Sequence, residues 1–278
     1  MKKIYGDVVL ITGASSGIGK ATAEFLAKHG YKVYGTSRKA YFETEEQVAA
    51  TSDSSGFIKM IPLDVCSDDS VKKAVSYVYE KEGHIDILIN NAGFGIAGSV
   101  EDTSPEEAFA QFNTNFFGTH RMLRAVLPIM RKQGKGLIIN VSSVAGVFPI
   151  PFQSMYSASK YAVESMTEAL RMELKPFGIK VSMVEPGDTR TGFTDQRLYA
   201  KDAQNSVYKK YFTKSVTSME KSERNGPGPH VVVKEIARII NSKNPPIRVT
   251  SGFSYKLFVF LKRFFPPRFI QFVISKMY

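Results

Sequence analysis

The chain of 278 residues has no tryptophan and a single cysteine, Cys66. One cysteine cannot form an intrachain disulfide, so we expect a reducing, cytoplasmic location. No apolar stretch approaches the roughly 20 residues that span a bilayer. The N-terminal sequence MKKIYGDVVLITGASSGIG begins basic and turns apolar. Its apolar run ends after about five residues in a glycine-rich loop, which favours a buried strand over a signal peptide.

Acidic residues are absent from the last part of the chain. After Glu235 there are eight lysines and arginines and no Asp or Glu, so residues 236–278 carry +8 of the net charge of +11. The first 235 residues are therefore close to neutral. A nucleic-acid-binding domain would carry a strong positive charge on its body, so we expect no nucleic-acid partner.

Apolar, strand-like runs alternate with amphipathic helical stretches along most of the chain. This alternation predicts right-handed βαβ units and an α/β fold, a doubly wound parallel sheet of about seven strands with helices on both faces. We expect residues 1–253 to form this domain, with 190–228 as a polar substrate lid and 254–278 as a C-terminal tail. Strands are predicted at 8–12, 32–37, 57–65, 85–93, 136–143, 180–187 and 247–250, and helices at 17–29, 68–82, 105–131, 154–175 and 230–241.

A glycine-rich loop, TGASSGIG, lies between the first predicted strand and the first predicted helix. Gly13, Gly17 and Gly19 permit a sharp turn and the close approach of a phosphate. The helix N-terminus would offer unpaired N–H groups and a positive dipole end to a pyrophosphate. A tight strand–helix turn without a ligand has the same spacing, but the first βα junction of an alternating pattern is where dinucleotides bind. These features indicate a Rossmann domain.

The end of the second predicted strand helps to choose the dinucleotide. An NAD site usually places a carboxylate there, to accept a hydrogen bond from the ribose 2′-hydroxyl. This strand ends in TSRKA, with Ser37 and Arg38 and no carboxylate. A hydroxyl and a guanidinium suit a 2′-phosphate, so NADP(H) is predicted in preference to NAD(H).

A serine, a tyrosine and a lysine have a spacing that suggests proton transfer. Ser143 ends a predicted strand thirteen positions before Tyr156, and Lys160 follows four positions later, on the same helix face as the tyrosine. A nearby ammonium would favour the phenolate and lower the tyrosine's pKa. Tyr77 and Lys81 have the same separation, but no strand-end serine precedes them, so we interpret that pair as surface packing.

With these motifs, the sequence resembles the short-chain dehydrogenases/reductases of the Tyr-x-x-x-Lys subgroup. The resemblance extends from Val8 to about Phe193. It is carried by TGASSGIG (12–19), LDV (63–65), NNAG (90–93), NFFG (115–118), the Ser-Tyr-Lys set and PGDTRT (186–191). It implies that the catalytic residues are Asn115, Ser143, Tyr156 and Lys160. It implies that the cofactor-binding residues are Gly13, Ser15, Ser16, Gly17, Ile18, Gly19, Ser37, Arg38, Asp64, Val65, Asn91, Ala92, Gly93, Tyr156, Lys160, Pro186, Gly187, Thr189 and Thr191.

The resemblance also implies a role for each catalytic residue. Tyr156 would donate a proton to the carbonyl oxygen as NADPH delivers hydride, and Ser143 would hydrogen-bond that oxygen. Lys160 would bind the nicotinamide ribose and lower the tyrosine's pKa, and Asn115 would hold a water that connects Lys160 to solvent. The four histidines are scattered in sequence, and we expect no metal.

Within the family, the sequence is most similar to the 17β-hydroxysteroid and retinol dehydrogenase branch. This likeness implies an oxidoreductase that interconverts a lipophilic alcohol and ketone or aldehyde, and a homo-oligomer. The alternatives are a 3-oxoacyl or small-ketone reductase, a catalytically inactive NADP(H) sensor and a membrane-surface scaffold. Residues expected to make the substrate cleft apolar are Phe94, Val147, Phe148, Phe152 and Phe193.

The tail, residues 254–278, is basic and aromatic. One interpretation is a peripheral membrane anchor, in which the aromatics enter the headgroup boundary and the cations meet anionic lipid. The other is a pair of helices that covers the substrate site or a subunit interface.

Overall fold

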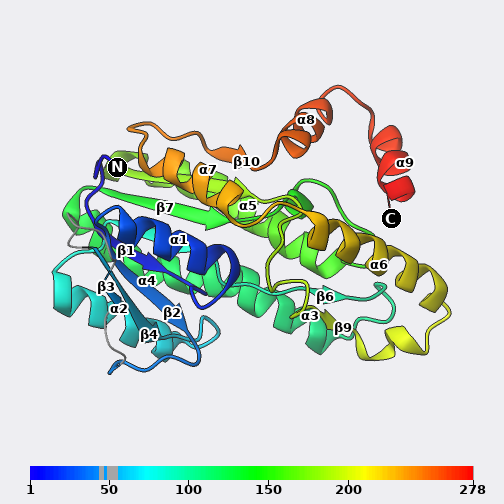
Figure 1. Cartoon of the computed structure of the whole chain (residues 1–278), viewed down its shortest axis with the longest axis horizontal. Helices are drawn as coiled ribbons and strands as arrows, with labels where there is room; N and C mark the ends of the chain where they lie inside the picture. Colours follow the sequence, from blue (N-terminus) through cyan, green and yellow to red (C-terminus); the bar gives the residue numbers. More distant parts are fainter. Residues whose placement is uncertain (44–46, 49–55, 278) are drawn as a thin grey trace.

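The seven predicted strands and a short edge strand, β3, form one sheet in the order β10-β8-β7-β5-β1-β2-β4-β3 (Figure 1). The computed structural model describes residues 1–43, 47–48 and 56–277. Seven strands are parallel, and the edge strand β3 (Gln47–Val48) pairs antiparallel with β4. The predicted doubly wound α/β fold is therefore confirmed. The parallel strands are β1 (Val8–Ile11), β2 (Lys32–Ser37), β4 (Phe57–Pro62), β5 (Ile87–Asn90), β7 (Gly136–Val141), β8 (Ile179–Glu185) and β10 (Arg248–Thr250).

Helices cover both faces of this sheet. Helices α1 and α7 pack on one face, and α2, α4 and α5 pack on the other (Figure 1). The strand order reverses between β1 and β5, which is where ligands of doubly wound sheets bind. The helices are α1 (Gly17–Lys28), α2 (Asp68–Glu82), α3 (Pro105–Phe112), α4 (Gly118–Gln133), α5 (Ser154–Glu173), α6 (Lys209–Asn225), α7 (His230–Ile240), α8 (Phe253–Leu261) and α9 (Pro267–Met277).

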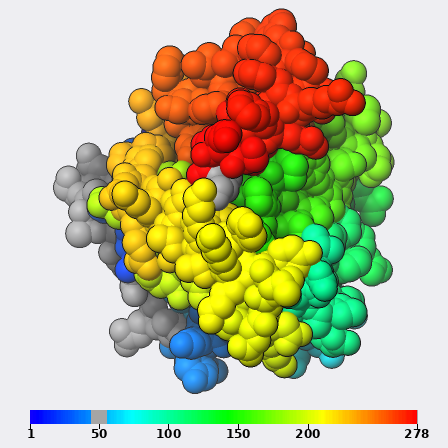
Figure 2. Space-filling view, turned by 90° about the vertical axis from the view of Figure 1, so that its right-hand side faces the viewer, coloured from blue at the N-terminus to red at the C-terminus, as the bar shows by residue number. Residues whose placement is uncertain are grey.

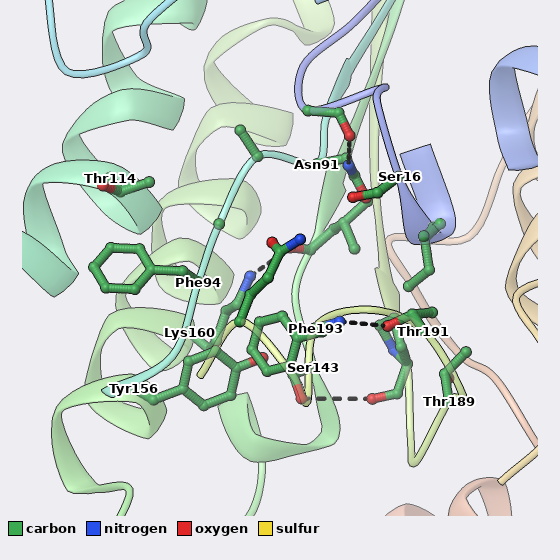
Figure 3. A pocket seen from close by; sticks show the side chains of 18 of the residues that line it. Ser16, Asn91, Phe94, Thr114, Ser143, Tyr156, Lys160, Thr189, Thr191 and Phe193 are labelled. Carbon is green, nitrogen blue, oxygen red and sulfur yellow. Dashed lines mark hydrogen bonds between the residues drawn. The ribbon is translucent and has the colours of Figure 1, made fainter. Parts of the chain in front are cut away.

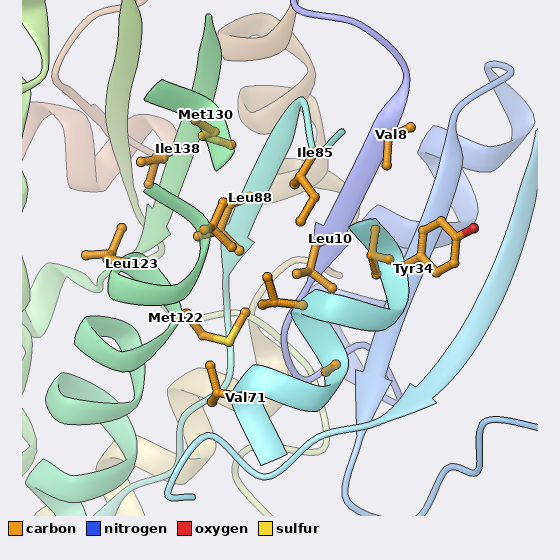
Figure 4. Packing of buried hydrophobic residues seen from close by; sticks show 14 of the residues in the cluster. Val8, Leu10, Tyr34, Val71, Ile85, Leu88, Met122, Leu123, Met130 and Ile138 are labelled. Carbon is orange, nitrogen blue, oxygen red and sulfur yellow. The ribbon is translucent and has the colours of Figure 1, made fainter. Parts of the chain in front are cut away.

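Alternate residues of each strand enter the two cores. In β1, Val8 and Leu10 face the α2–α4–α5 layer, whereas Val9 and Ile11 face the α1–α7 layer. All four side chains are fully buried, and Figure 4 shows the first cluster around Leu10. Burying such a side chain stabilises the fold by about 1.5–3 kcal/mol. The strands read as continuous apolar runs because both of their faces are covered.

Two regions differ from the helices and loops predicted from sequence. The predicted helix 105–131 is interrupted by a π-helical turn, Asn113–Phe117, between α3 and α4. The polar region 190–228 contains α6 and the short strand β9 (Leu198–Tyr199), which pairs with β6 (Ile96–Ala97). Helix α6 buries only a narrow stripe of its surface, so its apolar periodicity is hidden among exposed polar residues.

The tail forms α8 and α9 at the end of the molecule that also carries α6 (Figure 2). Helix α8 begins at Phe253, and the division into a 1–253 domain and a 254–278 tail stays a prediction. In the described part of the chain, every helix is too short or too polar to cross a membrane.

Candidate active site

A cleft of about 900 Å³ opens where the strands reach their carboxyl ends. Its walls come from the loops after β1, β2, β4, β5, β7 and β8, together with α5 (Figure 3). Two of the predicted site residues, Gly19 and Asn115, do not line it. The predicted residues that do are Gly13, Ser15, Ser16, Gly17, Ile18, Ser37, Arg38, Asp64, Val65, Asn91, Ala92, Gly93, Ser143, Tyr156, Lys160, Pro186, Gly187, Thr189 and Thr191.

The glycine loop is built for the close approach of a ligand. Gly13 and Gly17 have positive φ values of 66° and 54°, which favour glycine. A Cβ on Gly19 would lie 2.3 Å from the Gly13 carbonyl oxygen, so Gly19 lets α1 pack against the loop. Ser16 is the N-cap of α1, and its side chain makes no capping hydrogen bond. The helix N-terminus therefore keeps N–H donors for an anion, which fits a dinucleotide pyrophosphate.

The loop is held by the residues that follow β5. The Asn91 side chain donates to the carbonyl oxygens of Thr12 and Gly13, each at 3.0 Å. The Thr12 hydroxyl accepts from the backbone of Asn91 at 2.9 Å and of Ala92 at 3.0 Å. Sequence reasoning missed Thr12, although it directly precedes Gly13. These bonds fix the two loops on either side of the point where the strand order reverses.

Ser143, Tyr156 and Lys160 come together on one wall of the cleft (Figure 3). The Ser143 hydroxyl accepts from the Ala145 backbone N–H at 3.1 Å and donates to the Pro186 carbonyl at 3.5 Å. The Lys160 nitrogen lies 5.8 Å from the centre of the Tyr156 ring. The Lys160 amine donates to the Val141 carbonyl at 3.0 Å, at the end of β7. Phe193 covers the tyrosine with a ring-centre separation of 5.7 Å. The arrangement places a phenol, a hydroxyl and a buried amine on one wall of the cleft.

Asn115 lies behind this wall, in the π-helical turn between α3 and α4. Its side chain accepts from the Phe94 backbone N–H and donates to the Phe94 carbonyl, both at 3.1 Å. It also donates to the Ser159 hydroxyl at 3.1 Å, within α5. Only 1% of Asn115 is exposed. Its contacts join the Phe94 loop to the helix that carries Tyr156 and Lys160.

Comparison with known proteins shows the family of the chain. A family model described as short chain dehydrogenase matches residues 7–202. The chain belongs to the short-chain dehydrogenase family. It is therefore an oxidoreductase that acts on CH–OH groups with a nicotinamide cofactor.

This short-chain dehydrogenase is similar over most of its length to two curated relatives and one solved structure. A 3-ketodihydrosphingosine reductase of Bacteroides thetaiotaomicron is 45% identical over 274 residues, 98% of both chains. Human retinol dehydrogenase 8 is 35% identical over 274 residues, covering 91% of this chain and 84% of its own. The crystal structure of a Burkholderia phymatum short-chain dehydrogenase in complex with NAD has a TM-score of 0.79, with 26% identity and 95% of each chain covered.

The pKa of Tyr156 in this short-chain dehydrogenase is raised, whereas the sequence led us to expect a lowered value. The protein's own groups raise the pKa of Tyr156 to about 12, because burial outweighs the lowering effect of the Ser143 side chain. Burial lowers the pKa of Lys160 to about 8, against a smaller opposing effect of Glu164. The predicted lowering of the Tyr156 pKa by Lys160 is therefore not found among the protein's own groups, whose net effect raises this pKa. The buried amine is itself easily deprotonated.

A buried charged network behind the site was missed from sequence. Glu164 lies one helical turn after Lys160 on α5 and accepts from the Ser142 hydroxyl at 2.8 Å. Arg248 of β10 contacts Glu164 at 2.6 Å and Glu185 at 3.0 Å. Burial first, and then the Glu185 charge, raise the pKa of Glu164 to about 7. No local motif marks these residues, because they meet only when α5, β8 and β10 pack together.

One of the four histidines, His84, lies beside two aspartates. In the described ranges, Asp7, His84 and Asp86 form one group that could hold a metal ion, at the amino end of the sheet and away from the cleft. Asp86 already accepts from the backbone N–H groups of Asp7 and Val8. It also lies 3.7 Å from the Lys135 amine. We interpret the group as an anchor for the start of β1.

The apolar residues expected at the substrate end divide into three sets. Phe94 and Phe193 line the cleft as predicted. Phe148 lines a separate apolar groove beneath the tail. Val147 and Phe152 line neither, which corrects the prediction: Val147 is buried, and Phe152 packs against Phe212 of α6 at 5.9 Å.

Proposed function

We propose that this short-chain dehydrogenase reduces the ketone of a long-chain amphiphilic substrate of the 3-ketodihydrosphingosine class, with NADPH as hydride donor. The support for this substrate class is the identity to the Bacteroides thetaiotaomicron reductase over 98% of both chains. The single structural observation that carries the reaction is the Tyr156 side chain, which lines the cleft together with Ser143 and lies one helical turn from the buried amine of Lys160.

When bound, the nicotinamide supplies the hydride, and the chain supplies position and protons. Tyr156 donates its proton to the developing alkoxide, and Ser143 holds the same oxygen. Lys160 would hydrogen-bond the ribose and replenish the proton, which the lowered pKa of its amine favours. Asn115 holds the Phe94 loop against α5 through its hydrogen bonds to Phe94 and to Ser159.

NADP(H) is proposed over NAD(H) because of the charge at the end of β2. Thr36, Ser37, Arg38 and Lys39 all line the cleft, and this set contains two cations and no carboxylate. A 2′-phosphate would gain charge-assisted hydrogen bonds there, whereas a 2′-hydroxyl would lack its usual carboxylate acceptor.

We also propose that the tail contacts a membrane surface and that the chain forms a homo-oligomer. Phe260, Phe264 and Phe272 are 54%, 67% and 59% exposed on the tail, among lysines and arginines and no acids. Such a surface suits the headgroup region of an anionic bilayer, with the rest of the protein on the cytoplasmic side. Cell fractionation at low and high salt, with and without residues 254–278, tests the membrane contact, and the mass in solution tests the oligomer.

The substrate proposal is tested with purified enzyme and NADPH. We expect 3-ketodihydrosphingosine to be reduced with a higher kcat/KM than steroid ketones, retinal, 3-oxoacyl thioesters or small ketones. Retinal is the most informative competitor, because the retinol dehydrogenase relative also matches most of the chain. Preference for retinal or for a steroid would overturn the substrate class while leaving the reaction type in place.

A further inference from the structure

A second, apolar groove of about 110 Å³ lies between the tail and the body of the protein. Figure 2 shows the tail over this end of the molecule, next to α6. All of the lining residues are aliphatic or aromatic. They are Val144, Phe148 and Ile150 from the body, and Tyr255, Phe258, Leu261, Phe265, Phe269, Ile270, Val273, Ile274 and Met277 from the tail.

The groove adjoins the catalytic cleft. Val144 and Ile150 line both the groove and the cleft that contains Ser143 and Tyr156. Val144 directly follows Ser143 and begins the short turn Val144–Gly146. A molecule whose carbonyl lies at the Tyr156 hydroxyl can therefore extend past Val144 and Ile150 into the groove.

Specific contacts hold the tail over the active-site loops. The Tyr255 hydroxyl donates to Asp188 at 2.5 Å, and its ring packs on Gly187, where a Cβ would lie 2.1 Å from the ring. Both Gly187 and Asp188 line the cleft. At the other end of α8, the Lys262 amine donates to the Val147 carbonyl and lies 5.2 Å from the centre of the Phe148 ring. The end of α9 is bonded to α6, where the Ser218 hydroxyl donates to the Met277 carbonyl at 3.0 Å.

Despite these contacts, neither α8 nor α9 has a fully buried residue. Phe258, Phe265 and Phe269 line the groove, yet 41%, 41% and 44% of their surface stays exposed. Two helices attached by polar contacts but left with uncovered apolar side chains have the properties of a binding wall. Phe260, Phe264 and Phe272 do not line the groove and are available for a separate surface.

We propose that the groove between the tail and the body binds the hydrocarbon chain of the ketone substrate. This proposal rests on the proposed function, because it assigns one end of the substrate to the Tyr156 cleft and the other to the groove. An alkyl chain is the occupant that the structure favours, since the lining is apolar, the space is concave and two side chains are shared with the catalytic cleft. The tail is then a specificity element for chain length.

Binding can be measured without turnover, because the chain has no tryptophan. Phe269→Trp places a single tryptophan in the groove wall, and the matched variant Phe272→Trp places one on the same helix outside the groove. The probes are a long-chain 2-alkanone brominated at its far end and its short-chain counterpart. We expect the long probe to quench most of the Phe269→Trp emission in a saturable way, and to leave Phe272→Trp unchanged. We expect the short probe to quench neither.

Four other outcomes would overturn the proposal. Equal, non-saturating quenching of both variants by the long probe would show that the tail contacts aggregates of the probe. Equal quenching of both variants by vesicles of brominated anionic lipid would show that the tail contacts a membrane surface. Absence of quenching in both variants would show that the groove takes no alkyl chain. Quenching that follows protein concentration without any probe would assign the groove to a second copy of the chain.

Turnover separates this proposal from the proposed function. For wild type, kcat/KM should rise by roughly threefold to fourfold for each added methylene until the groove is filled. Val273→Trp fills the groove and should abolish this dependence on chain length, whereas Gln271→Trp, on the exposed side of α9, should retain it. A chain-length dependence that survives in Val273→Trp contradicts the groove assignment. Failure of wild type to reduce any ketone contradicts the proposed function and leaves the quenching result to decide the groove.

Discussion

The Lys160 amine lies 5.8 Å from the centre of the Tyr156 ring, and its pKa is lowered to about 8 by burial. Lys81 lies at the same 5.8 Å from the Tyr77 ring. Lys81 is exposed, and Tyr77 is half-buried, with its ring against Phe42 and the buried Tyr34. The distance between the two side chains therefore does not distinguish a proton-transfer pair from a surface pair. Burial and the Ser143 hydroxyl do.

The lowered pKa of Lys160 predicts a pH dependence of stability. Between about pH 8 and pH 10 the unfolded chain binds a proton at this lysine that the folded chain has lost. The free energy of unfolding therefore gains ~2–3 kcal/mol from this group as pH rises through that window. Lys160→Met should lack this gain, so urea unfolding of the two proteins should differ most in its pH slope. Parallel slopes would contradict the burial of a titrating amine.

The contacts of Asn115 predict a defect in both stability and substrate binding. Asn115→Leu leaves the Phe94 N–H without its acceptor, which should lower the free energy of unfolding by ~1–3 kcal/mol. It should also raise KM for the ketone, because Phe94 lines the cleft. The matched control is Asn113→Leu in the same π-helical turn, whose side-chain oxygen has no hydrogen-bond partner in the described part of the chain. Equal losses in both variants would assign the effect to the turn itself.

The charge of Arg38 predicts the choice between cofactors. Arg38→Leu should raise KM for NADPH by roughly tenfold to a hundredfold, the effect of losing a charge-assisted hydrogen bond, and should change KM for NADH little. Lys28→Leu, on an exposed part of α1 outside the cleft, controls for net charge. The comparison is made by initial rates with each cofactor at saturating ketone. A similar increase for both cofactors would mean that Arg38 does not recognise the 2′-phosphate.

The sequence predicted the parallel strands well because buried parallel strands are continuous apolar runs. Val9 and Ile11 illustrate this, since every neighbour of their strand was already predicted. The glycine loop and the Ser143–Tyr156–Lys160 set were found for a similar reason, because their spacing is local to one junction or one helix. These features depend on backbone geometry that a short segment determines.

The features missed from sequence depend on tertiary contacts. Glu164, Glu185 and Arg248 come from two strands and a helix, and only packing brings their charges together. The π-helical turn at Asn115 adds a residue to a helix whose periodicity otherwise continues from α3 to α4. The pKa of Tyr156 was predicted in the wrong direction for the protein's own groups, because spacing reveals a neighbouring cation but not the burial that opposes it.

The most direct test of the account is turnover by Tyr156→Phe with its ketone substrate, measured beside NADPH binding by the same protein. Removing one hydroxyl should abolish reduction while NADPH affinity stays within roughly threefold of wild type, because the phenol oxygen carries the proton and the cleft is otherwise intact. Tyr77→Phe, the matched control, should turn over like wild type. Reduction by Tyr156→Phe at a rate close to that of wild type would contradict the assignment of Tyr156 as the proton donor.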